Sequence, residues 1–317
     1  MPHHKPSKKS SKKPTRTTPK RRQRFGVKDG EKDPKIITYI IPWGVFEMIK
    51  PLIMSRTIKN EFSGSLHRTS GEFHNEHERA EHVEGKCCSE EFECFAHASI
   101  VRGVGDSASF FEDIPFTYHT HPTYYYTEYG VKIAPPSGED IGVFLRGCIE
   151  EKSCVHLVIS REGVYYIIPN PCFVYQARRL RKENKRDYNI ALVGAEILGM
   201  QTHEFRDSWT TDRWLTWIRT RFVCGEILVN EYREDIIDKF EYHCECGEAE
   251  IQKFEREFKR IVREYFDLST CAHRNPLSRM SQSEYAMWSE GNWIDVGFKS
   301  WRDLERDGGL EMKYSDF

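Results

Sequence analysis

Short strand-like segments alternate with helical ones from residue 35 to about residue 176. The strand-like segments are rich in β-branched and aromatic residues and cover residues 36–40, 61–67, 92–97, 99–104, 116–119, 155–160 and 164–168. Apolar residues at helical spacing lie between them, at residues 45–50 and 138–151. This interleaved order predicts an α/β fold for this part of the chain.

Beyond residue 176 the period of the apolar residues becomes helical. Spacings of three and four residues predict helices at residues 190–201, 209–221, 227–240 and 251–266. The last stretch carries Trp288, Trp293 and Trp301 among Gly, Ser and Asp residues, and we expect it to be irregular. The sequence thus predicts three parts: a basic arm (1–34), an α/β domain (35–176) with a His/Glu-rich insertion at 68–91, and a mostly α-helical extension (177–317).

Charge is distributed unevenly along the chain. The formal net charge is -2, but residues 1–24 hold ten of the 47 Lys and Arg residues and no acidic residue. This composition predicts a disordered arm that binds a polyanion or an acidic surface; a nuclear-entry signal and a solvated tail are the alternatives. The remaining residues carry a net negative charge, which argues against a uniformly basic nucleic-acid-binding domain.

Apolar runs are too short for a membrane span of about 18 residues, so we expect no membrane partner. The N-terminal residues also lack the apolar core of a secretory signal. Ten cysteines are scattered along the chain, without the density of a disulfide scaffold, which favours a reducing compartment. We therefore expect an intracellular protein of the cytoplasm or nucleus, or one inside a virus particle.

The sharpest local motif is His119-Thr120-His121-Pro122, at the end of a predicted strand. Side chains two residues apart on a strand project to the same side, so both imidazoles can reach one ion. A predicted helix that begins after Ser137 can supply a carboxylate from its first turn. Two histidines and one carboxylate, with one open position, form the ligand set of a catalytic zinc site.

Glu61 opens the strand Glu61-Phe62-Ser63-Gly64-Ser65-Leu66, and with it the chain resembles the JAB/MPN zinc metalloproteases, also called JAMM. That family's pattern is E-x-x-G-x-L, then H-x-H-P, then S-x-x-D, and all three pieces occur here in order, within about residues 36–170. The resemblance implies a JAMM-like mixed sheet flanked by helices and a peptidase or isopeptidase that acts on a protein substrate. It also implies His119, His121 and Asp140 as ligands of Zn²⁺, Glu61 as the general base and Ser137 as a donor to the oxyanion.

Two intervals depart from the family's pattern. The spacer Thr123–Pro136 is longer than usual and holds four tyrosines, so it could shape a substrate groove or block the metal. The interval Phe62–Tyr118 is lengthened by the His/Glu-rich insertion. S-x-x-D is also an ordinary helix capping box, and a lone H-x-H is more often a surface pair than a metal site.

A different class of function stays open at this point. The arm, the long spacer and the helical extension would also suit a structural or scaffold component of a large assembly, such as a virion, that uses a JAMM-like fold as an interaction module. Two further clusters contain metal-binding residue types, and the sequence leaves open whether the second of them binds another zinc ion. They are His74, His77, His82, Cys87, Cys88 and Cys94, and Cys244, Cys246, Cys271 and His273.

Overall fold

The computed structural model describes residues 35–68, 92–97, 100–103, 116–200, 209–221, 248–268 and 292–316. All of them belong to a compact unit that spans Lys32–Phe317. The basic arm, residues 69–91 of the His/Glu-rich segment and the helix predicted at 227–240 lie outside the described residues, as does the cluster of Cys244, Cys246, Cys271 and His273.

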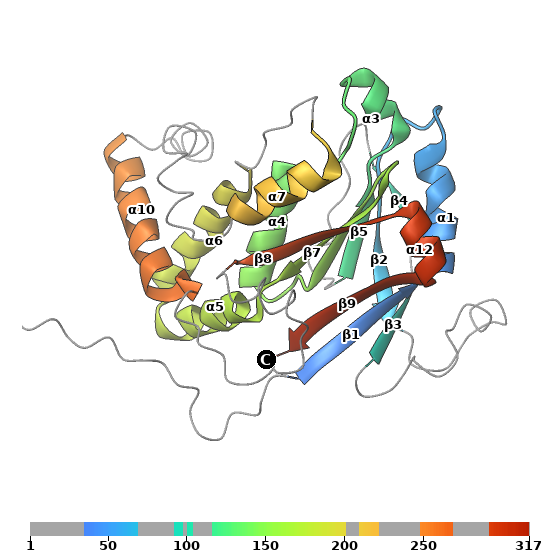
Figure 1. Cartoon of the computed structure of the whole chain (residues 1–317). Coiled ribbons are helices and arrows are strands. Elements are labelled where there is room, and N and C mark those ends of the chain that lie inside the picture. The colour runs from blue at the N-terminus through green and yellow to red at the C-terminus, as the bar shows by residue number, and fades with distance from the viewer. Residues whose placement is uncertain are drawn as a thin grey trace, which may run out of the picture. The chain divides into compact units, whose positions relative to one another are not determined.

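The described strands form one nine-stranded mixed sheet (Figure 1). Its order is β8-β7-β6-β5-β2-β3-β1-β9, and β4 pairs with β2 beside this path. The strands are β1 (Lys35–Pro42), β2 (Phe62–Arg68), β3 (Phe92–His97), β4 (Val101–Arg102), β5 (Phe116–Thr120), β6 (Val155–Ile159), β7 (Gly163–Pro169), β8 (Ile294–Ser300) and β9 (Gly309–Asp316). The pairs β1–β3 and β5–β6 are parallel and the others antiparallel. The chain contains both helices and strands, so the predicted α/β composition is confirmed.

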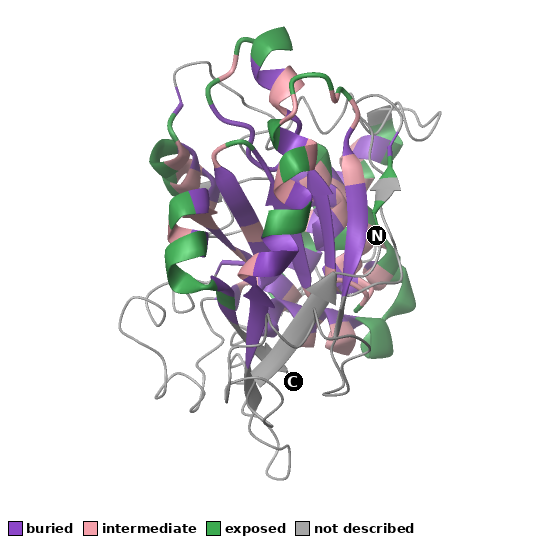
Figure 2. Ribbon diagram, turned by 90° about the vertical axis from the view of Figure 1, so that its right-hand side faces the viewer, coloured by how far each residue is buried: buried purple, intermediate pink, exposed green. Residues whose placement is uncertain are grey.

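Helices cover both faces of the sheet. They are α1 (Trp43–Met54), α3 (Thr123–Glu128), α4 (Gly138–Ile149), α5 (Pro171–Glu183), α6 (Lys185–Met200), α7 (Thr211–Arg221), α10 (Glu248–Ile261) with the π-helical turn η1 (Val262–Phe266), and α12 (Trp301–Asp307). One apolar core lies between the strands and helices α4 to α7 and α10, and a second lies between the strands and helices α1 and α12. Buried strands therefore run between two helical layers (Figure 2).

The prediction of an irregular C-terminal stretch was wrong for residues 294–316. This segment forms β8, α12 and β9: β8 pairs with β7, and β9 pairs with β1 over eight residues. Glycines and acidic residues hide a short alternating pattern there, in which Ile294 and Val296 are buried on the same face. Strand β9 also alternates, since Leu310 and Met312 are buried and Glu311 between them is exposed.

Besides α12, two of the described helices were not predicted. Helix α5 begins with Pro171, which has no backbone N–H to lose at a helix start, and the side chain of Asn170 accepts a hydrogen bond from the Cys172 amide. Helix α3 is a single short helix within the tyrosine-rich spacer. The spacer is therefore partly ordered secondary structure.

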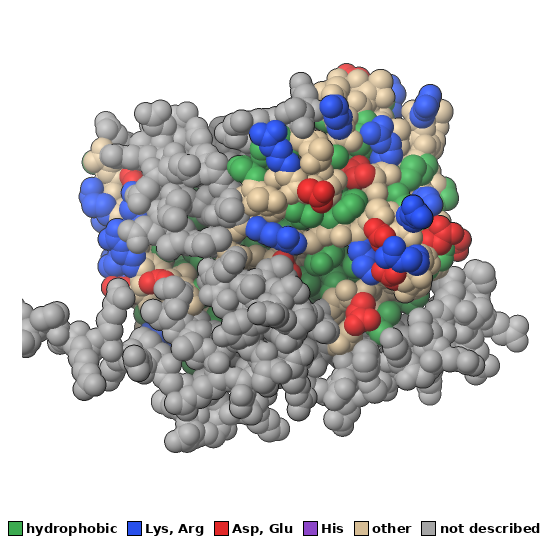
Figure 3. All heavy atoms as spheres, viewed as in Figure 1, with side chains coloured by type: hydrophobic (Ala, Val, Ile, Leu, Met, Phe, Trp, Pro, Cys, Tyr) green, Lys and Arg blue, Asp and Glu red, His purple; other side chains and the backbone are tan. Residues whose placement is uncertain are grey.

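Helix α4 packs closely against α6 because two glycines face each other. A side chain at Gly199 would collide with the backbone of Gly142, so the absence of a Cβ allows the two helices to approach. Positive and negative side chains are interspersed on the surface shown in Figure 3. No helix among the described residues is long and apolar enough to cross a membrane.

Candidate metal centre

Strand β5 presents alternate residues to opposite sides of the sheet. Tyr118 belongs to the core under α1 and α12, so Thr117, His119 and His121 point toward the α4 side. All four side chains are buried; His119 is 3% exposed and His121 8%. The two histidines of the motif therefore lie side by side within the protein.

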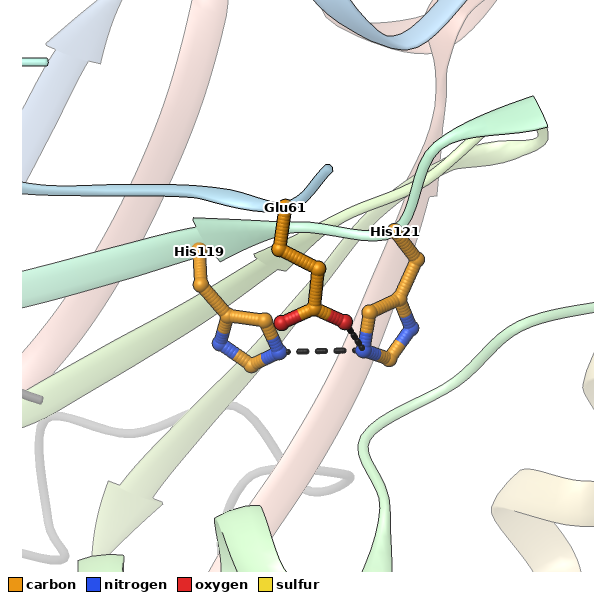
Figure 4. A group of neighbouring side chains, drawn as sticks. All are labelled: Glu61, His119 and His121. Atoms are coloured by element: carbon orange, nitrogen blue, oxygen red, sulfur yellow. Dashed lines mark hydrogen bonds and ion pairs between the residues drawn. The ribbon is translucent and has the colours of Figure 1, made fainter. Parts of the chain in front are cut away.

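Glu61 reaches the histidines because β2 and β5 are antiparallel. Ser63 pairs with His119, and continuing this register by two residues brings Glu61 opposite His121. The strand start is fixed by two hydrogen bonds: the Gly103 amide donates to the Glu61 carbonyl at 2.8 Å, and the Phe62 amide donates to Thr120 Oγ1 at 2.9 Å. The Glu61 carboxylate then lies over both imidazoles (Figure 4).

Helix α4 supplies Asp140 from its first turn. Ser137 is the N-cap: its Oγ accepts a hydrogen bond from the Asp140 amide at 3.2 Å, and its own amide donates to Asp140 Oδ2 at 2.6 Å. This is the complete capping box. The other oxygen, Asp140 Oδ1, lies 3.4 Å from His119 Nε2. One carboxylate thus caps the helix and faces the histidines at the same time.

The separations of the candidate donor atoms lie on either side of the value expected between the ligands of a tetrahedral metal ion. His119 Nε2 and His121 Nε2 are 3.0 Å apart, and Asp140 Oδ2 is 3.9 Å from His121 Nε2. Zinc–ligand bonds of 2.0–2.1 Å separate neighbouring ligand atoms by about 3.3 Å in a tetrahedron. Glu61 Oε1 lies 3.7 Å from His121 Nε2, close enough to be a ligand or the neighbour of one.

The tautomer of His121 follows from its hydrogen bond. Its Nδ1 lies 2.9 Å from the carbonyl oxygen of Ala134. A carbonyl oxygen can only accept, so Nδ1 carries the proton. In the neutral ring, the lone pair of Nε2 therefore points into the site, which is the arrangement a metal ligand needs.

His156 is a third buried histidine that the sequence analysis did not identify. It is 1% exposed, and its Nε2 lies 2.9 Å from His119 Nδ1. The parallel register of β5 and β6 pairs it with Thr117. The signal was present in the sequence, since His156 is the one polar residue in the otherwise apolar run Val155–Ile159.

Burial and mutual charge separate the protonation of the three histidines. Burial by itself would lower the pKa of His119, but the negative charges of Asp140 and Glu61 raise it to about 9. Burial and the charge of His119 lower the pKa of His121 to about 4 and that of His156 to about 3. Burial would raise the pKa of Asp140, yet His119 holds that pKa well below its ordinary value. Positive charge is therefore favoured at the point between the two carboxylates.

The tyrosine-rich spacer contacts the Nδ1 side of the His121 ring through Ala134. The Glu162 carboxylate accepts hydrogen bonds from Tyr126 Oη, from Tyr165 Oη at 2.8 Å and from the Ala134 amide at 2.8 Å. The carbonyl of the same Ala134 accepts from His121. The spacer thus orients one of the predicted ligands.

The structure brings together four of the five predicted site residues, Glu61, His119, His121 and Asp140, and Ser137 lies beside them as the cap of α4. Among the described residues, two overlapping groups could hold a metal ion: Glu61, His119 and His121, and His119, Asp140 and His156. Each contains two of the three predicted ligands His119, His121 and Asp140. Ser63 Oγ is buried across from His119 and has no hydrogen-bond partner among the described residues. An uncompensated hydroxyl at this point fits a site that receives a polar ligand.

Comparisons with known proteins give no relative for this chain. No family model matches it, no curated protein matches it, and no solved structure matches it.

Proposed function

We propose that this protein is a zinc-dependent hydrolase of the JAMM type, a peptidase or isopeptidase that cleaves an amide bond in a protein substrate. The single observation that carries the proposal is the convergence of Glu61, His119, His121 and Asp140, which come from three separate segments. The first three are buried and Asp140 is half-buried. Their ordered motifs would have no reason to meet if each were an isolated cap or surface pair.

Zinc suits the donor set better than a hard cation. Two imidazole nitrogens and one carboxylate are typical ligands of a catalytic zinc ion, whereas Ca²⁺ and Mg²⁺ prefer oxygen ligands. His119, His121 and Asp140 would hold the ion in this proposal. Their separations support it: 3.0 Å between the two Nε2 atoms, 3.4 Å from His119 Nε2 to Asp140 Oδ1 and 3.9 Å from His121 Nε2 to Asp140 Oδ2. When bound, zinc would make a water molecule acidic and polarise the scissile carbonyl.

Glu61 would act as the general base. Its carboxylate lies beside the two imidazoles (Figure 4), where it can accept a proton from the attacking water as the oxygen bonds to the carbonyl carbon. The same proton would then pass to the amide nitrogen as the C–N bond breaks, which leaves a carboxylic acid product and an amine. Glu61 is 6% exposed, so few water molecules would compete for this proton.

Ser137 would stabilise the charge on the carbonyl oxygen. Its Oγ accepts a hydrogen bond from the Asp140 amide, so the hydroxyl proton can still be donated. A donor fixed at a helix start is already oriented before the reaction, which is the condition for effective stabilisation of an oxyanion. The positive end of the α4 dipole adds to the effect.

Glu61→Gln tests the proposal because it removes the proton acceptor and keeps the shape of the side chain. We expect wild type and Glu61→Gln to hold about one zinc ion per chain, and His121→Ala to lose it. Cleavage of peptide and isopeptide substrates should fall about a hundred- to ten-thousand-fold in Glu61→Gln. Glu139→Gln is the matched control, because Glu139 is an exposed carboxylate on the same helix as Asp140.

Three results would count against parts of this scheme. Equal zinc content in wild type and His121→Ala would refute the metal centre. Loss of zinc in Glu61→Gln would make Glu61 a ligand instead of the base. Zinc-loaded wild type that cleaves nothing in a broad substrate panel, while wild type and Glu61→Gln assemble equally with a partner, would favour the scaffold function over the enzyme.

A further inference from the structure

His156 uses both nitrogens of its ring. Its Nε2 lies 2.9 Å from His119 Nδ1, and its Nδ1 lies 2.8 Å from Thr117 Oγ1. The rings of His156 and His119 are stacked, with centroids 5.0 Å apart. All three side chains are at least 96% buried, so this chain of hydrogen bonds is shielded from water. A buried polar chain that leads to a candidate ligand requires an explanation beyond packing.

When His119 is neutral, as a metal ligand must be, the protons in this chain can be arranged in two ways. In the first, His119 Nδ1–H donates to His156 Nε2, and His156 Nδ1–H donates to Thr117 Oγ1. The lone pair of His119 Nε2 then points into the site, toward His121 and Asp140. In the second, Thr117 donates to His156, and His156 donates to His119 Nδ1. The neutral His119 ring then carries its proton on Nε2, where a metal ion would have to bind.

We propose that His156 and Thr117 are positioning residues that hold His119 in the tautomer whose Nε2 binds the metal ion. The inference rests on the part of the proposed function that makes His119 a ligand. It gives His119 the same kind of support that the Ala134 carbonyl gives His121. A hydrogen-bond partner behind a ligating imidazole fixes both its ring orientation and its tautomer.

The test is the zinc affinity of the full chain, measured by competition with a chromophoric chelator, together with the visible absorption of the cobalt(II)-substituted protein. His156→Leu removes the acceptor for His119, while His156→Gln retains an oxygen that can accept. Thr117→Val removes the hydroxyl with little change in the shape of the side chain, and Thr117→Ser retains the hydroxyl. Leu157→Val is the control, because Leu157 lies on the same strand but belongs to the opposite core.

We expect His156→Leu to weaken zinc binding about 10- to 100-fold and to alter the cobalt(II) spectrum. His156→Gln and Thr117→Ser should lose less than His156→Leu and Thr117→Val, respectively. Leu157→Val should lower thermal stability and leave zinc affinity unchanged. If His156→Leu binds zinc as tightly as wild type, the positioning role is wrong and the metal centre stands; if wild type binds no zinc, both proposals fail.

A second measurement does not depend on the folding of any variant. Nitrogen-15 NMR of the zinc-loaded wild type should show a proton on His119 Nδ1 and a coupling across the hydrogen bond to His156 Nε2. A proton on His156 Nε2 instead would reverse the direction of the chain and overturn the inference.

Discussion

At the scale of single residues, Asp140 serves two neighbours with one carboxylate. Its Oδ2 accepts from the Ser137 amide at 2.6 Å, while its Oδ1 lies 3.4 Å from His119 Nε2. The capping-box interpretation of S-x-x-D and the metal-ligand interpretation are therefore compatible. The cap fixes the rotation of the carboxylate, so the oxygen that faces the histidines would lose little freedom on binding an ion.

Asp295, on β8, offers a pH-dependent test of stability away from the metal centre. Its Oδ1 is buried and has no hydrogen-bond partner among the described residues. Burial raises its pKa to about 6, although the charge of Arg219 acts in the opposite direction. Because the folded state binds the proton more tightly than the unfolded state, the free energy of unfolding should fall as pH rises from about 4 to about 6.

We therefore expect Asp295→Asn to stabilise the protein at pH 7.5 by about 1 to 2 kcal/mol and to have little effect at pH 4. Urea unfolding at both pH values measures the difference. Asp212→Asn, at an exposed position on α7, should show no such pH dependence. A stabilisation by Asp295→Asn of the same size at both pH values would contradict the ionisation argument.

At the scale of secondary-structure elements, the spacer between β5 and α4 depends on the β6–β7 turn. Arg161 lies over the Tyr126 ring at 3.8 Å from its centroid, and the Arg161 amide donates to Tyr126 Oη at 3.1 Å. At its start, the spacer is tied to α1 by a 2.7 Å hydrogen bond from Thr123 Oγ1 to the Ile53 carbonyl. Its backbone is thus held at both ends, and Ala134 is fixed behind His121.

Glu162→Gln should disturb this arrangement, because an amide cannot accept three hydrogen bonds as the carboxylate does. We expect unfolding free energy to fall by about 1 to 3 kcal/mol. Zinc affinity should fall several-fold, since Ala134 would hold His121 less firmly. Glu128→Gln is the control: Glu128 also accepts from a tyrosine, Tyr124, but on the exposed side of α3. If Glu162→Gln is less stable but binds zinc with unchanged affinity, Glu162 stabilises the spacer without affecting the orientation of His121.

At the scale of the whole molecule, the sheet is completed by strands from the end of the chain. Strand β8 extends it beyond β7, and β9 covers β1. The segment 301–307 between them forms α12, and the Trp301 indole donates to the Ser160 carbonyl at 3.1 Å. The C-terminal segment therefore stabilises the same sheet that carries the candidate metal centre.

The basic arm also belongs to this scale. The ten positive charges of residues 1–24 should bind a polyanion such as heparin with an affinity that falls steeply as salt increases, because binding releases counterions. Deletion of residues 1–24 should flatten this salt dependence and leave zinc content unchanged. Heparin-affinity chromatography over a range of salt concentrations measures the effect. Equal elution of the full and shortened chains would indicate that the arm is a solvated tail.

Patterns of neighbouring residues were sufficient to predict part of this structure. The cap at Ser137 and the helix after it depend on residues within one turn, and they were predicted correctly. The histidines of β5 share one face because strand geometry alternates every residue, whatever the rest of the chain does. Such features can be predicted because the residues that determine them lie close together in the sequence.

The remaining features depend on contacts between residues that are distant in the sequence. His156 contacts His119 because the parallel strands β5 and β6 pair in one particular register. Glu61 lies opposite His121 because the antiparallel strands β2 and β5 pair in another. Strand β9 (309–316) pairs with β1 (35–42), which lies near the other end of the chain. Strand propensity is set largely by such neighbours, so only the tertiary structure decided the order of the strands, the place of the C-terminal strands in the sheet and the contact of His156 with the candidate metal centre.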